Sequence, residues 1–405
     1  MSTVVVIGGG AAGLMAAYAA SFNNKVILLE KNEKLGKKIY ITGKGRCNVT
    51  NDCSVEEFIK NVVTNPKFMM SSINAFSPSD MMELLSSNGV MLKTERGNRV
   101  FPVSDKASDI TKCLEKLILS SGVDVRLNAE VVSLLIDDGS ILGVKTVDTE
   151  ILCDKIIVCT GGVSYPVTGS TGDGYRFAKQ VGHTVVTPIA ALTGLNLKGD
   201  EYLRLQGLSL KNVKVSVFRG DKRIYSDFGE MLFTHFGVSG PTVLSASSVV
   251  NKECFDELRL SIDLKPALSE EELDERILRD FSAYKNKDFR NALNDLLPKA
   301  LIPIIIERSG VNPLKKVNEI NAKERRNLLM CLKNLSYEIS SLRPVEEGIV
   351  TCGGVSVKEI NPKTMESKKI SGLYFAGEVI DVDAFTGGFN LQIAFSTGYA
   401  AGNAV

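Results

Sequence analysis

Residues 3–13 of the chain read TVVVIGGGAAG, a short β-branched run that leads directly into a G-x-G-x-x-G motif. The β-branched run predicts a buried strand, and the small residues that follow predict a helix over about residues 11–21. A second strand is expected at residues 25–29, and it ends on Glu30. Strand, glycine turn, helix, strand and acid in this order predict a βαβ unit that binds a dinucleotide, with a purely structural unit as the alternative.

Each part of this motif has a physical role. Gly8 allows the tight turn, Gly10 lets the backbone approach a pyrophosphate, and Gly13 lets helix and strand pack closely. The helix N-terminus offers free N–H groups and a positive dipole end to phosphates. Glu30 lies where a carboxylate accepts the ribose hydroxyls, and because an acid there disfavours a 2′-phosphate, we expect FAD or NAD rather than NADP.

The bulk composition restricts the class of protein. With 405 residues and 44% hydrophobic residues, the chain can bury a large core and is expected to form two or three domains. A net charge of +1 argues against nucleic acid or an anionic membrane as the main partner. The apolar run at residues 301–306 contains Pro303 and is too short to cross a bilayer. A strand begins within three residues of Met1, so no targeting segment is expected and we predict a cytoplasmic protein.

The eight cysteines form no C-x-x-C pair, and the chain has only two histidines. No zinc-ligand spacing exists, so we predict no metal site and interpret the cysteines as buried free thiols. A disulfide-reducing flavoenzyme is disfavoured, because it needs a paired redox dithiol.

Between the first unit and about Thr187 the pattern alternates between helices and strands. Residues 36–48 form a loop rich in glycine and cations. The expected elements after this loop are helices at 55–61, 79–86 and 107–120, a strand at 123–127, a hairpin of 129–137 with 140–147, a strand at 155–159, and a helix that follows Gly172-Asp173-Gly174.

The pattern changes at about Thr187, after which residues 192–264 read as a small β domain with few helices. Residues 269 to about 342 read as helical, with a capping box at Ser269 and Glu272 and amphipathic stretches over 289–308 and 322–337. The predicted domains are residues 1–187 and 343–405, which together form the FAD-binding domain, an inserted β-rich substrate domain at 188–268, and an inserted helical domain at 269–342.

The C-terminal segment returns to the first pattern. A buried strand at 373–376 ends in Gly377-Glu378, and Gly387-Gly388 opens a helix of small residues that reaches Ala401. A strand that ends in glycine and an acid, far from the first glycine turn, is typical of the part of a flavin domain that holds the ribityl chain. The predicted fold class is therefore α/β, with a discontinuous Rossmann-like domain.

Six blocks of the sequence resemble the BaiN/YhiN-like group of two-dinucleotide-fold flavoproteins, also called the aminoacetone-oxidase-like FAD-binding family. The blocks are VVVIGGGAAGLMAA (4–17), GKKIYITGKGRCNVTN (36–51), TGGVSYPVTGSTGDGY (160–175), GEMLFTHFGVSGPTVL (229–244), GIVTCGGV (348–355) and GLYFAGEVIDVDAFTGGFNLQIAFSTGYAAG (372–402). The resemblance covers essentially the whole chain. It implies tightly bound FAD, a Rossmann-like FAD domain, and an inserted small β-barrel domain and helical domain.

The resemblance also implies a set of FAD contacts at the pyrophosphate, the adenosine ribose, the adenine, the ribityl chain and the flavin pyrimidine. Its members are Gly8, Gly10, Ala11, Ala12, Gly13, Glu30, Lys31, Lys37, Thr42, Gly43, Arg46, Asn48, Val131, Thr160, Gly161, Gly377, Glu378, Gly388, Asn390, Leu391 and Gln392. The last three would direct their N–H groups at the flavin, where a helix N-terminus stabilises the anionic reduced ring.

Two side chains are candidates for proton transfer. His235 stands in a glycine-rich loop of the inserted domain. Histidine side chains in general can gain or lose a proton near neutral pH, so His235 could move a proton beside a hydride transfer, although a structural histidine is the alternative. Tyr165 could hydrogen-bond a substrate carbonyl or simply pack. His183 follows Gly182 at a helix end and is interpreted as a cap or surface residue.

We expect an FAD-dependent oxidoreductase that transfers hydride between a small or ring-shaped organic substrate and flavin N5. The preferred hypothesis is an NAD(P)H-dependent reductase of enones in steroid- or bile-acid-like rings. An O₂-dependent oxidase of a small amine such as aminoacetone is the alternative. A tRNA-modifying or non-catalytic flavoprotein is less favoured, because the chain has no basic tract. No second G-x-G-x-x-G exists, so NAD(P)H would visit the same cleft transiently. The sequence leaves the oligomeric state open.

Overall fold

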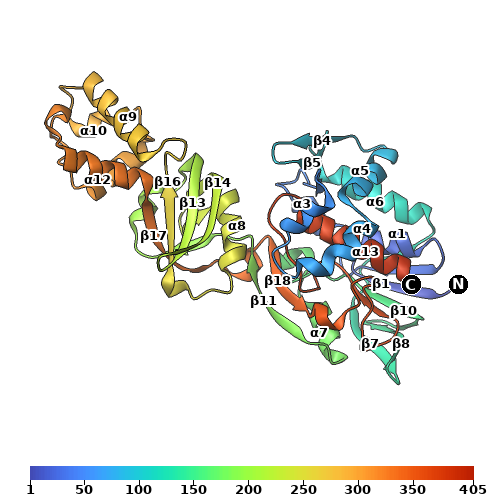
Figure 1. The fold of residues 1–405 in the computed structure, drawn as a ribbon. Coiled ribbons are helices and arrows are strands. Elements are labelled where there is room, and N and C mark those ends of the chain that lie inside the picture. Colours follow the sequence, from blue (N-terminus) through green and yellow to red (C-terminus); the bar gives the residue numbers. More distant parts are fainter. The chain divides into compact units, whose positions relative to one another are not determined.

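A computed structural model describes all residues 1–405, and the chain divides into two compact units (Figure 1). Unit 1 comprises Met1–Ala191 and Pro344–Val405, and unit 2 comprises Leu192–Arg343. Unit 1 is therefore discontinuous in sequence, with unit 2 inserted between its two parts. The four-part domain scheme of the sequence stays a prediction. None of the helices combines the length and the apolar character that a membrane-spanning helix needs.

The core of unit 1 is a five-stranded parallel sheet. Its spatial order is β19 (Leu373–Phe375), β10 (Lys155–Val158), β1 (Thr3–Ile7), β2 (Lys25–Leu29), β6 (Asp124–Arg126). Val4, Val5 and Val6 are fully buried, as expected for a strand with both faces covered. The chain leaves β1 toward β2 on one side and reaches β10 on the other, so the strand order reverses between β1 and β10. Ligands of such sheets bind outside the carboxyl ends of the strands at this point.

Helices cover the sheet, and smaller sheets border it. The helices are α1 (Ala11–Ala20), α2 (Lys37–Ile41), α3 (Val55–Lys60), α4 (Met70–Ala75), α5 (Pro78–Ser87), α6 (Ala107–Ser120), α7 (Asp173–Gln180) and α13 (Phe389–Ala404). One small sheet contains β3 (Thr50–Asn51), β5 (Arg99–Pro102) and β4 (Leu92–Glu95) in this order. A second contains β7 (Val131–Asp137), β8 (Ser140–Thr146) and β9 (Glu150–Leu152). A third pairs β11 (Val185–Ala191) with β18 (Val350–Val355). The elements that the sequence predicted agree with the observed ones to within about two residues. The helices α2, in the stretch expected to be a loop, and α4, and the strands β3, β4, β5, β9, β11 and β18, were not predicted.

Small residues let α1 and α13 pack at close range, although they are almost 400 residues apart in sequence (Figure 1). A Cβ at Gly398 would overlap the carbonyl oxygen of Ala12, and one at Gly402 would overlap that of Ala16. The C-terminal helix is thereby fixed against the helix that follows the glycine turn. The hydroxyl of Thr397 on α13 also accepts a hydrogen bond from the Gly377 N–H at 2.9 Å.

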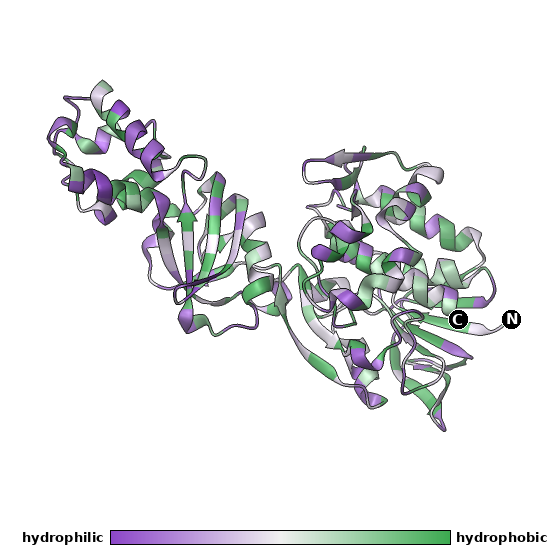
Figure 2. Cartoon of the chain, viewed as in Figure 1, coloured by the Kyte–Doolittle hydropathy of each residue, from purple (hydrophilic) through white to green (hydrophobic).

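Unit 2 contains a closed six-stranded barrel. Around the barrel the strands are β12 (Leu195–Leu197), β15 (Gly237–Ser239), β14 (Lys222–Thr234), β13 (Ser209–Arg219), β16 (Leu258–Asp263), β17 (Leu335–Leu342). Every neighbouring pair is antiparallel. Alternate residues such as Val213, Val215 and Val217 face the core, and Figure 2 shows hydrophobic and hydrophilic residues alternating along these strands. The predicted fold class, a discontinuous Rossmann-like domain with an inserted barrel and helices, is confirmed.

Three local expectations for unit 2 are corrected. Residues 335–342, read as the end of a helical stretch, form β17, because Leu335, Tyr337 and Ile339 alternate inward and pair with β16 and β12. The stretch 289–308 is divided into α10 (Phe289–Ala292), the 3-10 turn η5 (Lys299–Leu301) and α11 (Ile302–Ser309), because Pro298 and Pro303 interrupt it. The residues read as nearly helix-free include α8 (Pro241–Val250). The remaining helices are α9 (Glu270–Ala283) and α12 (Ala322–Lys333).

His183 is a buried network residue rather than a surface residue. Its Nδ1 lies 3.1 Å from the Glu359 carboxylate, its Nε2 lies 2.7 Å from the Ser367 hydroxyl, and its ring meets Phe375 edge-on. Burial lowers the pKa of this imidazole below its usual value, and the neighbouring carboxylate offsets part of that effect. His183 therefore joins the end of α7 to the segment before β19, which is a structural role.

Candidate functional site

The turn after β1 leaves space for a phosphate-bearing ligand. Gly8 has a φ of +101°, and a Cβ there would lie 2.6 Å from the carbonyl oxygen of Cys159. A Cβ at Gly13 would overlap the carbonyl oxygen of Gly8. Gly10 differs from both, because a Cβ at Gly10 would meet no atom within 4 Å. Packing inside the protein therefore explains Gly8 and Gly13 but not Gly10, whose open side is available to a ligand.

The N-terminus of α1 faces this space without any competing group. Gly10 is its N-cap residue, no side chain caps the helix, and its first turn contains no acid. Leu14 is the first residue whose N–H bonds to the Gly10 carbonyl, so the preceding N–H groups of Ala11, Ala12 and Gly13 remain for an anion.

Glu30 is buried at the end of β2 and touches the same turn. Its Oε2 accepts a hydrogen bond from the Gly9 N–H at 2.7 Å. Its Oε1 accepts from the backbone N–H of Asn32 at 2.8 Å and from the Asn32 amide at 2.6 Å. An ionised carboxylate has about four acceptor positions, so these three donors leave room for a ribose hydroxyl. Glu30 thus both shapes the glycine turn and can accept from a nucleotide.

Buried polar atoms without a partner also lie in the segments that surround the carboxyl ends of β1, β10 and β19. They are Asn48 Oδ1, Thr160 Oγ1 and Tyr175 Oη. A buried polar atom that is left unsatisfied costs about 1–3 kcal/mol, so three such atoms indicate a missing partner. The open side of Gly10, the free helix N-terminus and these atoms fit a dinucleotide with a polar ring system, as FAD is.

Glu378, at the Gly-acid end of β19, is the centre of an ion-pair network. Its Oε2 lies 2.7 Å from Lys38 Nζ, and its Oε1 accepts from the Ser164 hydroxyl at 3.0 Å and from the Thr351 N–H at 2.8 Å. Lys38 also donates to Ser164 Oγ at 2.5 Å. The network joins α2, the loop after β10 and β18 beside the glycine turn. Burial raises the pKa of the nearby Tyr175 phenol well above its usual value, and the Glu378 carboxylate raises it further.

The N-terminus of α13 supplies fewer free N–H groups than expected. Asn390 and Leu391 lie in its first turn, but the Gln392 N–H donates to the Gly388 carbonyl at 3.1 Å. The Gln392 side chain is also engaged, since it accepts from the Thr50 hydroxyl and donates to the Phe76 carbonyl. Gln392 therefore holds the core below the helix N-terminus, and the expectation that its N–H points at a flavin is corrected.

Three of the cations expected along the diphosphate and the flavin edge have protein partners. Lys31 Nζ contacts Asp173 at 2.7 Å, and Lys37 Nζ contacts Glu33 at 3.1 Å. Arg46 pairs with Glu95 and Asp105, and its guanidinium lies over the Phe101 ring. Their contacts with a cofactor stay a prediction.

The other predicted residues lie at the ends of the strands and in the loops that follow them. Thr42 ends α2, where its hydroxyl donates to the Lys38 carbonyl, and Gly43 follows it with a φ of +61°. Val131 is buried at the start of β7. Gly161 and Gly377 have φ values of +74° and +80° in the loops after β10 and β19.

The two catalytic candidates belong to different units. Tyr165 is half-buried in unit 1, and it adopts a left-handed conformation with a φ of +50°, which is uncommon for a residue with a Cβ. His235 is exposed in unit 2, in the turn between β14 and β15, and its ring meets Phe236 edge-on. Both roles stay predictions.

A model of the "HI0933-like protein Rossmann domain" matches residues 2–404. The chain belongs to this family. HI0933-like proteins are FAD-dependent oxidoreductases, which agrees with the resemblance seen in the sequence and with the fit of the site to FAD. This chain is accordingly an FAD-dependent oxidoreductase of the HI0933-like family.

Three curated relatives match the chain nearly end to end. A "3-dehydro-bile acid delta(4,6)-reductase" from Clostridium scindens is 29% identical and covers 100% of this chain and 99% of its own length. A "Ribosomal RNA dihydrouridine synthase" from Escherichia coli is 30% identical, and one from Haemophilus influenzae is 32% identical; each match covers 98% of this chain and 96% of the relative.

Solved structures share the fold. A 3-ketosteroid-Δ4-(5α)-dehydrogenase from Rhodococcus jostii RHA1 matches with a TM-score of 0.55 and 15% identity, covering 100% of this chain and 96% of its own. A flavocytochrome c3 fumarate reductase matches with a TM-score of 0.53 and 19% identity, covering 100% of this chain and 78% of its own. At these identities the likeness concerns the fold alone.

Sequence reasoning did not single out Ser164, Thr351 or Tyr175, and it named Lys38 only as one of a cluster of cations, with Lys37, Lys44 and Arg46, for which a phosphate or flavin role was favoured over a solvated loop. The sequence contains Lys37 and Lys38 in one glycine-rich run, and nothing local tells which one turns inward. In the structure Lys38 reaches Glu378, whereas Lys37 pairs with Glu33 nearer the surface. Tyr175 carried one usable signal, because an aromatic hydroxyl directly follows the Gly172-Asp173-Gly174 turn.

Substitution of Glu30 should lower FAD retention. Glu30→Gln keeps the size of the side chain but brings an NH₂ group toward the Gly9 or Asn32 N–H groups, and Glu30→Ala removes the acceptors altogether. We expect both purified variants to have a lower ratio of flavin to protein absorbance than the parent and a higher Kd for added FAD.

The matched control for this experiment is Glu33→Ala, because Glu33 is an exposed acid three residues away that pairs only with Lys37. Its FAD content should equal that of the parent. Full flavin content in both Glu30 variants would show that Glu30 does not hold the nucleotide.

Proposed function

We propose that this protein reduces a carbon–carbon double bond that is conjugated to a carbonyl group, with NADH or NADPH as the electron donor. The observation that carries the proposal is the reaction type that its relatives share. One relative is named as a delta(4,6)-reductase of a 3-dehydro-bile acid, and two are named as synthases of dihydrouridine. Each of these names describes the saturation of a ring double bond that is conjugated to a carbonyl group. Two such different substrates in near full-length relatives favour this reaction over any single compound.

The reaction is a two-electron reduction. The nicotinamide donor loses a hydride equivalent, the double-bond carbon farther from the carbonyl gains the hydride, and the carbon next to the carbonyl gains a proton. Hydride transfer between the nicotinamide donor and the substrate is the chemistry that bound FAD would supply. The chain must bind the cofactor, orient the substrate carbonyl and deliver the proton.

The residues of the candidate site suit these three tasks. The glycine turn and Glu30 would hold the nucleotide end of FAD, and Lys38 with Glu378 would lie toward the ribityl chain. Tyr165 or His235 would deliver the proton or polarise the carbonyl by a hydrogen bond. These residue assignments are part of the proposal.

Two substrate classes fit the proposal. The first is a steroid-like ring enone, the substrate class of the Clostridium scindens relative. The second is a uracil base within RNA, which the names of the two ribosomal RNA dihydrouridine synthases favour. The expectation that nucleic acid is not a partner is based on the net charge and on the absence of a basic tract, and it stays a prediction. The names of all three relatives describe reductions, so oxidation of a small amine becomes the weaker alternative.

Anaerobic flavin spectroscopy tests the proposal. The purified protein, loaded with FAD, is mixed with NADH or NADPH until its absorbance near the flavin maximum disappears. The reduced protein is then mixed with a 3-oxo-4,6-diene steroid acid or with a uridine-containing transcript of ribosomal RNA, and in a separate sample the oxidised protein is mixed with aminoacetone. We expect reoxidation by the first or the second compound, with a product that has gained two hydrogen atoms by mass spectrometry. The proposal would be contradicted if O₂ reoxidised the flavin and neither the steroid acid nor the RNA did so. Reduction of the flavin by aminoacetone would also contradict the proposal.

A further inference from the structure

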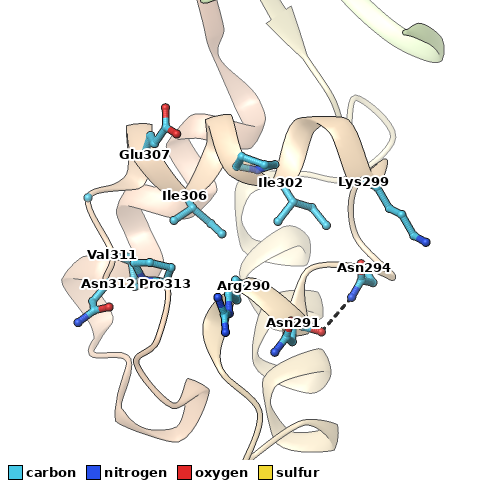
Figure 3. A pocket seen from close by; sticks show the side chains of 12 residues that line it. Arg290, Asn291, Asn294, Lys299, Ile302, Ile306, Glu307, Val311, Asn312 and Pro313 are labelled. Atoms are coloured by element: carbon cyan, nitrogen blue, oxygen red, sulfur yellow. Dashed lines mark hydrogen bonds between the residues drawn. The ribbon is translucent and has the colours of Figure 1, made fainter. Parts of the chain in front are cut away.

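The helical part of unit 2 contains an open groove that the proposed reaction does not use. The groove has a volume of about 700 Å³ and lies between α10, α11 and the turn after α11 (Figure 3). In the figure Ile302 and Ile306 project from α11 toward Arg290 and Asn291 of α10. Its size is that of a site for a nucleotide-sized ligand.

The walls of the groove combine an apolar floor with amide groups. Ile302 and Ile306 form the apolar side, and Pro313 faces them from the turn. Asn291 and Asn294 line the other side, where the Asn294 amide donates to the Asn291 carbonyl at 3.1 Å. Apolar side chains beside amide donors and acceptors offer contacts for the face and the edge of a nucleobase.

The charge of the groove is positive. Arg290 and Lys299 line it, both are exposed, and neither forms an ion pair or a side-chain hydrogen bond. The one acid in the lining, Glu307, is neutralised by Arg204, which donates two hydrogen bonds to its carboxylate at 2.7 and 2.8 Å. The two cations are therefore free to bind an anion on a groove with apolar walls.

We propose that this groove binds single-stranded RNA, with phosphates on Arg290 and Lys299 and a base against Ile302 and Pro313. The inference rests on the proposed function in its second substrate class, a uracil base within RNA. It adds that the strand is held by the helical part of unit 2, outside the flavin-binding unit. Proteins that bind single strands combine a positively charged groove along the backbone with side chains, most often aromatic, on which bases stack. In this groove Ile302 and Pro313 would provide the apolar contact for a base.

Fluorescence anisotropy with the full-length, FAD-loaded protein tests the groove. The probe is a fluorescein-labelled uridine decamer, titrated at several salt concentrations. Each phosphate contact with a single strand contributes about 0.7 to the slope of log K against log salt. The double variant Arg290→Ala/Lys299→Ala should therefore bind roughly tenfold or more weakly, with a slope smaller by about 1.4.

The matched control is Lys285→Ala/Lys323→Ala, which removes two exposed, unpaired cations of the same helical part that do not line the groove. It should keep the affinity and slope of the parent, and both double variants should keep the parent's Tm. A second probe, the same decamer with an uncharged methylphosphonate backbone, should bind the parent weakly.

Equal affinities for the parent and the Arg290/Lys299 variant, or equal loss in the control variant, would overturn the proposal. So would a methylphosphonate decamer that binds as tightly as the natural one. Reduction of the small dienone should be unchanged in the groove variant. Binding is measured without turnover. If the protein reduced neither an enone nor uracil, the proposed function would be refuted, and the anisotropy data would still decide whether the groove binds RNA.

Discussion

The variant Gly10→Val is expected to fold like the parent and to lose most of its FAD. A Cβ at this position would meet no protein atom within 4 Å, so we expect the substitution to leave the fold intact. The valine side chain does enter the space in front of the α1 N-terminus, where the pyrophosphate of FAD would lie. Overpacking costs about 1–3 kcal/mol, so the Kd for FAD should rise by about tenfold to a hundredfold or more.

The flavin absorbance of the purified variant and its Kd for added FAD, measured together with its Tm without FAD, check this prediction. Gly13→Ala is the informative comparison, because a Cβ there overlaps the Gly8 carbonyl oxygen and should lower the Tm of the apoprotein itself. If Gly10→Val retained FAD like the parent, the nucleotide would not lie at this turn, and the assignment of the whole N-terminal site would have to be abandoned.

The second large effect is expected at the proton donor. If Tyr165 or His235 supplies the proton, then Tyr165→Phe or His235→Ala should slow substrate-linked reoxidation of the flavin by about a hundredfold, the usual scale of general acid catalysis. Each substitution removes the proton-donating group, and the half-buried Tyr165 ring keeps its packing as phenylalanine.

Stopped-flow rates of flavin reduction by NAD(P)H and of reoxidation by substrate separate the two half-reactions. FAD content should be unchanged in both variants, and reduction by the nicotinamide should be little affected, because it needs no proton from the protein. Parent rates in both variants would mean that solvent or the substrate provides the proton, and both catalytic assignments would be wrong.

The βαβ unit and most elements of unit 1 could be predicted from the sequence because their signals are local. The helix expected from residue 11 runs over Ala11–Ala20, and the one expected at 107–120 is α6. Such elements are specified by β-branched runs, caps and glycines within a few residues of each other. The return of the flavin pattern at residues 373–378 likewise predicted a discontinuous domain, and β19 pairs with β10 more than 200 residues earlier.

The strand β17 could not be recognised in the same way. Its inward residues Leu335, Tyr337 and Ile339 alternate, but they directly follow the amphipathic helix α12, and a short alternating segment after a helix resembles its continuation. Its partners β16 and β12 begin about 75 and 140 residues earlier in the sequence. Pairing over such distances depends on barrel closure, which no local pattern contains.

For the site, the sequence by itself determined the glycine turn, the acid at the end of β2 and the Gly-acid end of β19, because each depends on backbone geometry that only particular residues permit. The tertiary structure alone decided which side chains meet there. It brings Lys38 rather than Lys37 to Glu378, engages Arg46 with Glu95 and Asp105, and turns Gln392 into the core. The physical reason is that backbone conformation is set by neighbouring residues, whereas the partner of a long polar side chain is set by elements packed against it from distant parts of the chain.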